Sequence, residues 1–286
     1  MNPMIVLVPD LHIEDWVIAD WEACAQWIVD NATTNNIVAV VGEGDFVTTA
    51  STANFAMATV GFDIIDVAGI PYVMNIGNHD YDDPDDWMSR IATYFHAAYP
   101  LSRFYGKNWY GGSYDGTLID NMYARFSFGG HDYLMFSLEF HPRTAVLAWA
   151  LSIVRQNPRS EVMITTHNYL WFDGTIEAGG LIDIWNDLAK HLAHGVMITC
   201  GHNGYNPGDP TSAIRQDTGG YGKIIPAIFC NHQNGSNRDA LGLLTLTPGS
   251  SIIDMKEYCP VQAIWDGTGA YMLPLRIDRA RATVRR

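Results

Sequence analysis

Short apolar runs recur along the chain, and polar residues or glycine follow each of them closely. Most of these runs are rich in valine and isoleucine, and they occupy residues 4–8, 37–41, 72–74, 162–164 and 196–198. Runs of this length that end at glycine or polar residues are typical of strands buried on both faces of a sheet. They predict a core built around β-strands.

Segments with apolar residues at helical spacing separate these runs. Between residues 15 and 31, for example, apolar side chains recur at intervals typical of an amphipathic helix. Further helices are expected over residues 52–68, 86–99 (with Asp85 as its cap), 143–156 and 181–194. Residues 109–138 instead predict short antiparallel strands joined by glycine turns, and strands are expected again up to residue 275.

Strands that alternate with helices, followed by a β-rich second half, favour an α/β (α+β) fold in which two sheets pack between helices. No linker, repeat or low-complexity segment interrupts the sequence. The polar motifs of interest also lie in both halves of the chain. We therefore expect residues 1–286 to form one domain.

Polar motifs follow all five apolar runs. In chain order they are Asp10-Leu11-His12, Gly44-Asp45, Gly77-Asn78-His79-Asp80, His167-Asn168 and Gly201-His202. Open α/β sheets place their ligand chemistry just past the carboxyl ends of buried strands, so we expect these motifs to converge. Carboxylate, imidazole and amide oxygen together suit Mn²⁺, Fe²⁺ or Zn²⁺, and the lack of cysteine in the motifs argues against a thiolate-rich structural zinc site.

The order of these motifs closely resembles that of the calcineurin-like metallophosphoesterase superfamily. The resemblance covers roughly residues 4–260, and residues 109–114, 137–140, 166–167 and 231–233 look like a bacterial, purple-acid-phosphatase-like branch. It implies a four-layer αββα sandwich of two mixed β-sheets flanked by helices. It also implies two divalent metal ions (Mn²⁺, Fe²⁺/Fe³⁺ or Zn²⁺) and hydrolysis of a phosphodiester or phosphomonoester by a hydroxide held between them.

The resemblance implies a role for each motif residue. Six residues would bind metal: Asp10 and His12 the first ion, Asn78, His167 and His202 the second, and Asp45 both. His79 would act as general acid toward the leaving group, and Asp80 would orient the His79 imidazole through a hydrogen bond.

One motif departs from the family pattern. The last motif of the family usually reads Gly-His-x-His, whereas this chain has Gly204 in place of the second histidine, by substitution or by loss of one residue. The first metal would keep three protein ligands, which with water is a normal catalytic shell. We expect weaker binding of that metal, with water, Asn203 or Asp209 filling the position. The alternative function is a catalytically impaired protein of this fold that binds a ligand or partner.

Four residues are candidates for substrate contact. Trp109, Tyr110 and Tyr169 could stack on a base or sugar, although aromatic residues also fill cores. Arg143 could bind a phosphoryl oxygen bidentately, or could be a residue of a helix surface. A missing fourth protein ligand favours diesters slightly over highly charged monoesters.

Histidine and cysteine residues outside the motifs are expected to be structural. A structural or exposed position is favoured for His232 over a ligand role, but its place in an Asn-His-Gln turn after a predicted strand keeps the ligand role open. The four cysteines lack CxxC spacing and are expected to be buried, reduced thiols, namely Cys24, Cys200, Cys230 and Cys259.

Charge and hydropathy limit the partners. The chain has 17 basic and 31 acidic residues, a formal net charge of −14 at pH 7. It lacks the basic cluster that duplex nucleic acid requires, so a small phosphoester is the expected partner. No run approaches the length of a membrane span, and the first run lacks the basic flank of a secretory signal, which favours the cytoplasm.

Overall fold

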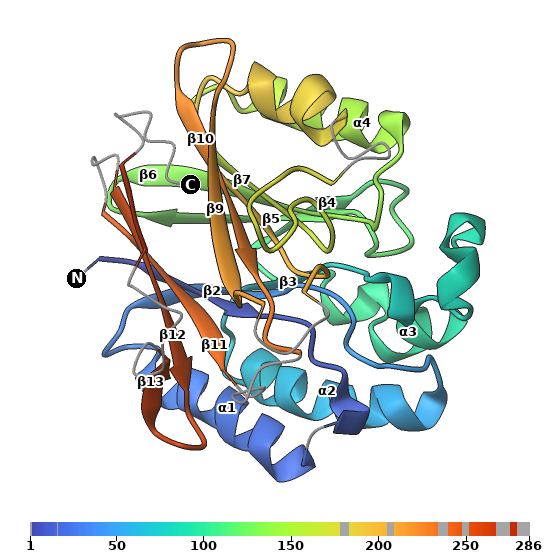
Figure 1. Cartoon of the computed structure of the whole chain (residues 1–286). Helices are drawn as coiled ribbons and strands as arrows, with labels where there is room; N and C mark the ends of the chain where they lie inside the picture. The colour runs from blue at the N-terminus through green and yellow to red at the C-terminus, as the bar shows by residue number, and fades with distance from the viewer. Residues whose placement is uncertain are drawn as a thin grey trace.

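Two mixed β-sheets face each other in the centre of the molecule, with helices outside (Figure 1). The computed structural model describes residues 2–15, 17–177, 183–204, 209–233, 240–247, 252–266 and 275–278. The first sheet has the order β13-β12-β11-β1-β2-β3, and β14 pairs with β12. Its strands are β1 (Met4–Val8), β2 (Ile37–Gly42), β3 (Tyr72–Met74), β11 (Leu241–Leu246), β12 (Ile252–Cys259), β13 (Ile264–Asp266) and β14 (Leu275–Asp278).

The second sheet has the order β4-β5-β6-β7-β8-β10-β9. Its strands are β4 (Tyr110–Ser113), β5 (Met122–Phe128), β6 (His131–Leu138), β7 (Glu161–Thr166), β8 (Gly195–Cys200), β9 (Ser212–Thr218) and β10 (Ile224–Cys230). The strands β4, β5 and β6 pair antiparallel, as their glycine turns predicted. The central strands β8 and β10 are buried along their whole length, which explains why they read as continuous apolar runs.

Helices cover the outer faces of both sheets. Figure 1 shows α1 (Ile18–Asn31) and α2 (Thr52–Val67) on one side of the sandwich and α4 (Thr144–Gln156) on the other. The two helices of the first side are joined by Trp21, whose indole N–H donates to the carbonyl of Ala58 at 2.9 Å. The predicted αββα sandwich of two mixed sheets is therefore confirmed.

The predicted helix over residues 86–99 is two shorter elements. A 3₁₀ segment (Pro84–Ser89) and α3 (Thr93–Ala98) are separated by Arg90, whose φ is 57°. The Arg90 guanidinium donates to the carbonyl oxygens of Phe140 and, at 2.8 Å, His141, and these contacts favour a break in the helix. The cap is also not Asp85, because Asp83 accepts a hydrogen bond from the Asp85 N–H at 3.0 Å.

The predicted helix over residues 181–194 is also irregular. Leu181 and Ile182 lie outside the described residues, and the remainder is a π-helical turn (Ile184–Leu188) followed by a 3₁₀ turn (Ala189–His191). The Ala189 N–H bonds to the Ile184 carbonyl, five residues earlier, and both side chains are buried. Further 3₁₀ turns occupy Ile13–Asp15, Asn78–Asp80 and Leu101–Arg103.

All four cysteines are buried, as predicted. Among the described residues, no helix is both long and apolar enough to cross a membrane.

Candidate metal centre

The five polar motifs converge at one edge of the two sheets. They follow β1, β2 and β3, which are parallel neighbours in the first sheet, and β7 and β8, which are parallel neighbours in the second. Parallel strands end at the same edge, so their loops meet although the sequence separates them widely. For example, the backbone N–H of His202 bonds to the carboxylate of Asp10, 192 residues away.

Two groups of potential ligands share one carboxylate. Asp10, His12 and Asp45 form one group, and Asp45, His167 and His202 form the other. Within each group, one ligand atom per residue lies within 4.8 Å of the other two. The shared residue is Asp45, for which the resemblance implied a bridging role. Two overlapping ligand sets suit a pair of neighbouring cations.

One oxygen of the Asp45 carboxylate accepts a backbone hydrogen bond, and the other lies near a histidine of each group. Its Oδ1 accepts a hydrogen bond from the backbone N–H of His79 at 2.9 Å. Its Oδ2 lies 3.0 Å from Nε2 of His167 and 3.5 Å from Nε2 of His12. Oδ2 is therefore the Asp45 oxygen that lies near an imidazole nitrogen of each group.

Contacts on the far side of two imidazole rings turn the rings toward Asp45. Nδ1 of His167 lies 2.6 Å from the carbonyl oxygen of Glu43, which makes Nδ1 a donor and directs Nε2 at Asp45. Nδ1 of His12 lies 3.1 Å from the hydroxyl oxygen of Thr48. Metal-binding histidines are commonly oriented by such contacts, so both rings are arranged to act through Nε2.

Two buried atoms of the site show that a cation fits it. Oδ1 of Asn78 and Nε2 of His12 are buried, and neither forms a hydrogen bond with any residue that the structure describes. Nε2 of His12 does lie 3.5 Å from Oδ2 of Asp45, beyond the length of a good hydrogen bond. A buried polar atom without a hydrogen bond costs free energy, and both atoms are of types that bind divalent cations. The donor set is therefore compatible with the divalent ions that the resemblance implies.

Burial and neighbouring charges shift the pKa values of the candidate ligands in different directions. Burial acts to lower the pKa of His167, but the carboxylates of Asp45 and Asp10 raise this pKa to about 10. Burial and the charge on His167 lower the pKa of His202 to about 3. Burial acts to raise the pKa of Asp45, but His167 and His12 hold this pKa well below its usual range. Burial raises the pKa of Asp10 to about 6. The site thus favours positive charge at its centre.

Four of the six predicted metal ligands have a left-handed backbone. Their φ angles are 32° at Asp10, 39° at His12, 50° at Asp45 and 71° at His202. For residues other than glycine this conformation costs of order 1–3 kcal/mol each, and such strain is concentrated at functional sites. The sharp turns occur directly after strand ends, where they direct the side chains over the edge of the sheets.

Glycines in two motifs allow the carboxylates to approach the backbone. A Cβ atom at Gly77 would lie 2.1 Å from Oδ1 of Asp45, and one at Gly201 would lie 2.1 Å from Oδ2 of Asp10. No side chain fits at these distances. Glycine is therefore required at position 77 by the placement of Asp45, and at position 201 by the placement of Asp10. In each case the predicted ligand comes from another motif.

Asp80 does not orient His79, contrary to the prediction. Nδ1 of His79 lies 2.8 Å from the carbonyl oxygen of Thr48 instead. The Asp80 carboxylate turns into the core, where it accepts hydrogen bonds from the backbone N–H groups of Phe46 and Gly77, both at 2.9 Å. Burial and the nearby charge of Asp45 raise the pKa of Asp80 to about 8. Asp80 therefore fastens two motif loops together.

Sequence reasoning missed two residues that arrange the histidines. Thr48 presents its hydroxyl to His12 and its carbonyl oxygen to His79, and the centroids of these two rings are 5.1 Å apart. Glu14 accepts hydrogen bonds from the backbone N–H groups of Thr48 and Thr49, each at 2.8 Å. The only signal in the sequence is that Glu14 and Thr48 lie close to motif residues.

The backbone at Gly204 disfavours the histidine that the family pattern would place there. Its φ of +145° is a conformation that residues with a side chain rarely adopt. A Cβ atom there would also lie 3.4 Å from Cζ of Phe229, a contact of ordinary length. The strain of a side chain at this position would therefore come from the backbone.

Two residues were proposed as substitutes for that histidine, Asn203 and Asp209. Asn203 is buried, and its Nδ2 donates to Oδ1 of Asn168, the carbonyl of Leu170 and Oε2 of Glu177 at 2.9–3.0 Å. Asp209 is in neither group among the described residues. The three-residue first group thus lacks an additional His, Cys, Asp or Glu ligand within the described part of the chain.

Arg143 uses its guanidinium within the protein. Its Nε and Nη2 donate to the two carboxylate oxygens of Glu139 at 2.7 and 3.0 Å. Glu139 is buried, whereas the Arg143 side chain is 51% exposed at the start of α4. This pairing favours the helix-surface alternative, and a contact with a phosphoryl oxygen stays a prediction.

The structure buries two of the three aromatic candidates. Trp109 is 4% exposed, and its ring packs in the core at 5.4 Å from that of Tyr72. Tyr169 is fully buried in the second hydrophobic core. A substrate role for Trp109 or Tyr169 was therefore a wrong prediction, because neither ring faces solvent. Tyr110 is half-buried on β4, and its role stays a prediction.

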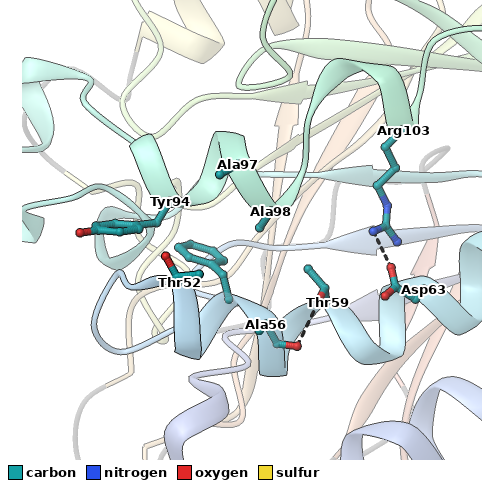
Figure 2. A pocket seen from close by; sticks show the side chains of 9 residues that line it. Thr52, Ala56, Thr59, Asp63, Tyr94, Ala97, Ala98 and Arg103 are labelled. Carbon is teal, nitrogen blue, oxygen red and sulfur yellow. Dashed lines mark hydrogen bonds and ion pairs between the residues drawn. The ribbon is translucent and has the colours of Figure 1, made fainter.

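A groove of about 280 Å³ lies away from these motifs, between α2 and the segment that contains α3. Figure 2 shows Thr52, Ala56 and Thr59 along α2 opposite Tyr94 and the alanines of α3. An ion pair of 2.6 Å between Arg103 and Asp63 lies at one end. The groove contains none of the predicted site residues.

Comparisons by sequence give one curated relative and no family. No family model matches the chain. The chain is 27% identical over 245 residues to the uncharacterized protein YvnB of Bacillus subtilis. The match covers 82% of this chain but only 18% of that protein, so this chain spans less than a fifth of its relative's length.

Comparisons by structure give several solved relatives of low sequence identity. A dimetal phosphatase from Danio rerio matches with a TM-score of 0.57 at 12% identity, over 96% of this chain and 98% of its own. A purple acid phosphatase from yellow lupin (Lupinus luteus) has the same TM-score at 11% identity, over 93% of this chain and 52% of its own. GAP50, described as the anchor in the inner membrane complex of Plasmodium, matches with a TM-score of 0.50 at 9% identity, over 97% and 89%.

Proposed function

Since the chain has the calcineurin-like metallophosphoesterase fold, we propose that it is a metal-dependent phosphoesterase acting on a small phosphodiester or phosphomonoester. The observation that carries this proposal is the pair of overlapping ligand groups that share Asp45. Fold alone does not establish chemistry, whereas the residues of the site determine which reaction it can support.

The chain's own residues would hold two divalent ions. Asp10, His12 and Asp45 would bind the first, and Asp45, Asn78, His167 and His202 the second. When bound, two such ions lower the pKa of water and offset the negative charge of phosphoryl oxygens. The unpaired Oδ1 of Asn78 supports this assignment, as does Nε2 of His12, whose one contact in the site is the Asp45 carboxylate at 3.5 Å.

We infer that His79 exchanges a proton with the substrate. Its Nδ1 is held by the Thr48 carbonyl, so Nε2 is the ring nitrogen left for the leaving-group oxygen. Its side chain is half-buried at the site, next to His12. A histidine fixed in one orientation can donate the proton that a departing alkoxide requires. We assign His79 the role of general acid.

The ring of Phe140 packs against both histidines of the second ligand group. Its centroid lies 5.2 Å from that of His202 and 5.8 Å from that of His167. An apolar ring in contact with the two imidazoles lowers the local dielectric constant and so strengthens their interaction with charge.

The second candidate function is a binding protein of the same fold. Gly204 favours it, because the first ligand group has three members rather than four. The structural similarity to GAP50, described as an anchor, is consistent with it. The oriented His79 favours the enzyme, because a scaffold would not require a proton donor beside the ligands.

The test is hydrolysis of bis-p-nitrophenyl phosphate and p-nitrophenyl phosphate with added Mn²⁺, Fe²⁺ or Zn²⁺. We expect turnover that is lost in Asp45→Ala and retained in Asp132→Ala. Asp132 is an exposed aspartate at the opposite end of β6, which makes it a matched control. Diesters are expected to react faster than monoesters, since a three-ligand first site neutralises less charge. Equal rates in wild type and Asp45→Ala would overturn the proposal.

A further inference from the structure

A third group of potential ligands lies outside the candidate metal centre. It consists of Cys230, His232 and Glu257, and one ligand atom from each lies within 4.8 Å of the other two. All three side chains are buried, with exposures of 0%, 1% and 1%. Sequence reasoning expected both Cys230 and His232 to be structural, and it did not single out Glu257.

The three residues come from both sheets. Cys230 is the last residue of β10 in the second sheet, and His232 follows two residues later. Glu257 lies on β12 of the first sheet, where alternate side chains face inward. Glu257 occupies one of these inward positions between Met255 and Cys259. A carboxylate in an otherwise apolar row requires a compensating partner.

The contacts of Glu257 satisfy only one of its two carboxylate oxygens. Its Oε2 lies 2.9 Å from Nε2 of His232 and accepts a hydrogen bond from the Thr211 hydroxyl at 3.1 Å. Its Oε1 is buried and forms no hydrogen bond with any described residue. The carboxylate thus has an acceptor oxygen available within a cluster that also contains a thiol and an imidazole.

We propose that Cys230, His232 and Glu257 form a third metal site, which binds a divalent ion of borderline softness such as Zn²⁺. Thiolate, imidazole and carboxylate are the ligand types that Zn²⁺ takes, and a sulfur ligand excludes Ca²⁺ and Mg²⁺ in practice. On binding, the Cys230 thiol forms an S–metal bond and releases its proton to solvent. The bound dication is then balanced by one thiolate and one carboxylate, so no net charge is buried.

An ion at this position joins the two sheets and supports the candidate metal centre. Asn231 lies between Cys230 and His232 in sequence, and its Nδ2 donates to the carbonyl oxygen of His202 at 3.1 Å. A metal ion bound by Cys230 and His232 would hold Asn231 in place between them. The hydrogen bond from Asn231 would then hold the backbone of His202, a predicted ligand. The third site is structural in this proposal and holds no substrate.

Cobalt substitution tests the site without using activity. None of the six predicted ligands of the candidate metal centre is a cysteine, so a thiolate-to-Co²⁺ charge-transfer band can arise only from another site. We expect the full-length protein loaded with Co²⁺ to show this band. It should disappear in Cys230→Ser, with loss of one bound equivalent, and persist in Cys200→Ser. Cys200 is a matched control because it is equally buried at the end of β8.

The opposite outcomes overturn the proposal. One such outcome is Co²⁺-loaded wild type that shows no thiolate band. The other is a band that is lost in Cys200→Ser but not in Cys230→Ser. Either result would mean that His232 and Glu257 form a metal-free pair. If Cys230→Ser does not fold, X-ray absorption of the Zn²⁺-loaded wild type decides, since a sulfur neighbour is expected at about 2.3 Å. Asp45→Ala should keep the band, so failure of the phosphoesterase proposal leaves this test intact.

Discussion

The hydroxyl and the carbonyl oxygen of Thr48 act on different histidines. The hydroxyl contacts Nδ1 of His12, a predicted metal ligand, and the carbonyl contacts Nδ1 of His79, the proposed general acid. The two contacts are separable, because a side-chain substitution removes only the first. Thr48 thus offers a way to perturb metal binding while His79 keeps its orientation.

Replacing Thr48 with valine should weaken binding of the first metal. Valine has nearly the shape of threonine but cannot bond to His12, and loss of such a supporting contact typically costs about 10–100-fold in metal affinity. Competition titration with Mn²⁺ measures the effect. Thr48→Ser keeps the hydroxyl and should bind almost as wild type does, so equal losses in both variants would contradict the assigned contact.

Asp80 joins two motif loops through backbone hydrogen bonds, and this role differs from orientation of His79 in a measurable way. In Asp80→Asn, one oxygen becomes an NH₂ group facing a backbone N–H. We expect a loss of about 1–3 kcal/mol in the free energy of unfolding, measured by urea denaturation. Asp83→Asn is the control, because asparagine caps a turn about as well as aspartate does. A large fall in kcat with unchanged stability would instead restore the original role in orienting His79.

At the scale of elements, buried strands were more predictable than helices. Strands such as β1 and β2 are buried on both faces, so their composition reports their structure directly. The break at Arg90 was not predictable, because it depends on carbonyl oxygens of Phe140 and His141, about 50 residues later in the chain. The π-helical turn after residue 183 likewise follows from burial against the rest of the fold.

The same distinction holds for the candidate site. Motif residues could be identified because each short polar motif follows an apolar run that predicts a buried strand. The supporting residues could not be identified from the sequence. The hydrogen bonds of Asp80 and Thr48 connect residues about 30 positions apart, so they leave no local sequence pattern. Glu257 shows the remaining limit, because an acidic residue in a strand normally suggests an exposed face.

Removing the Arg90 guanidinium should destabilise the segment between the 3₁₀ turn and α3. Arg90→Met keeps the apolar stem but loses the bonds to Phe140 and His141, so we expect about 1–3 kcal/mol lower stability in urea denaturation. Phe140 also lies against His202, so metal affinity should fall with stability. Arg155→Met, at an exposed position in the last turn of α4, is the matched control and should leave both quantities unchanged.

At the scale of the whole molecule, the proposed cations would explain how the fold tolerates buried carboxylates. The chain has a formal net charge of −14, and several of its carboxylates are buried where the sheet edges meet. Buried carboxylates are costly unless a positive group offsets them. Two divalent ions around Asp45 and one near Glu257 would supply the positive charge that offsets these carboxylates between the sheets. Stability, metal binding and activity are therefore linked in this account.

Anomalous diffraction from crystals saturated with Mn²⁺ tests the central claim most directly. The account predicts two peaks about 3.5–4 Å apart, one on each side of Oδ2 of Asp45. One should lie near Asp10 and His12, and the other near Asn78, His167 and His202. A single peak, or two peaks that do not share Asp45, would contradict the proposed two-metal centre.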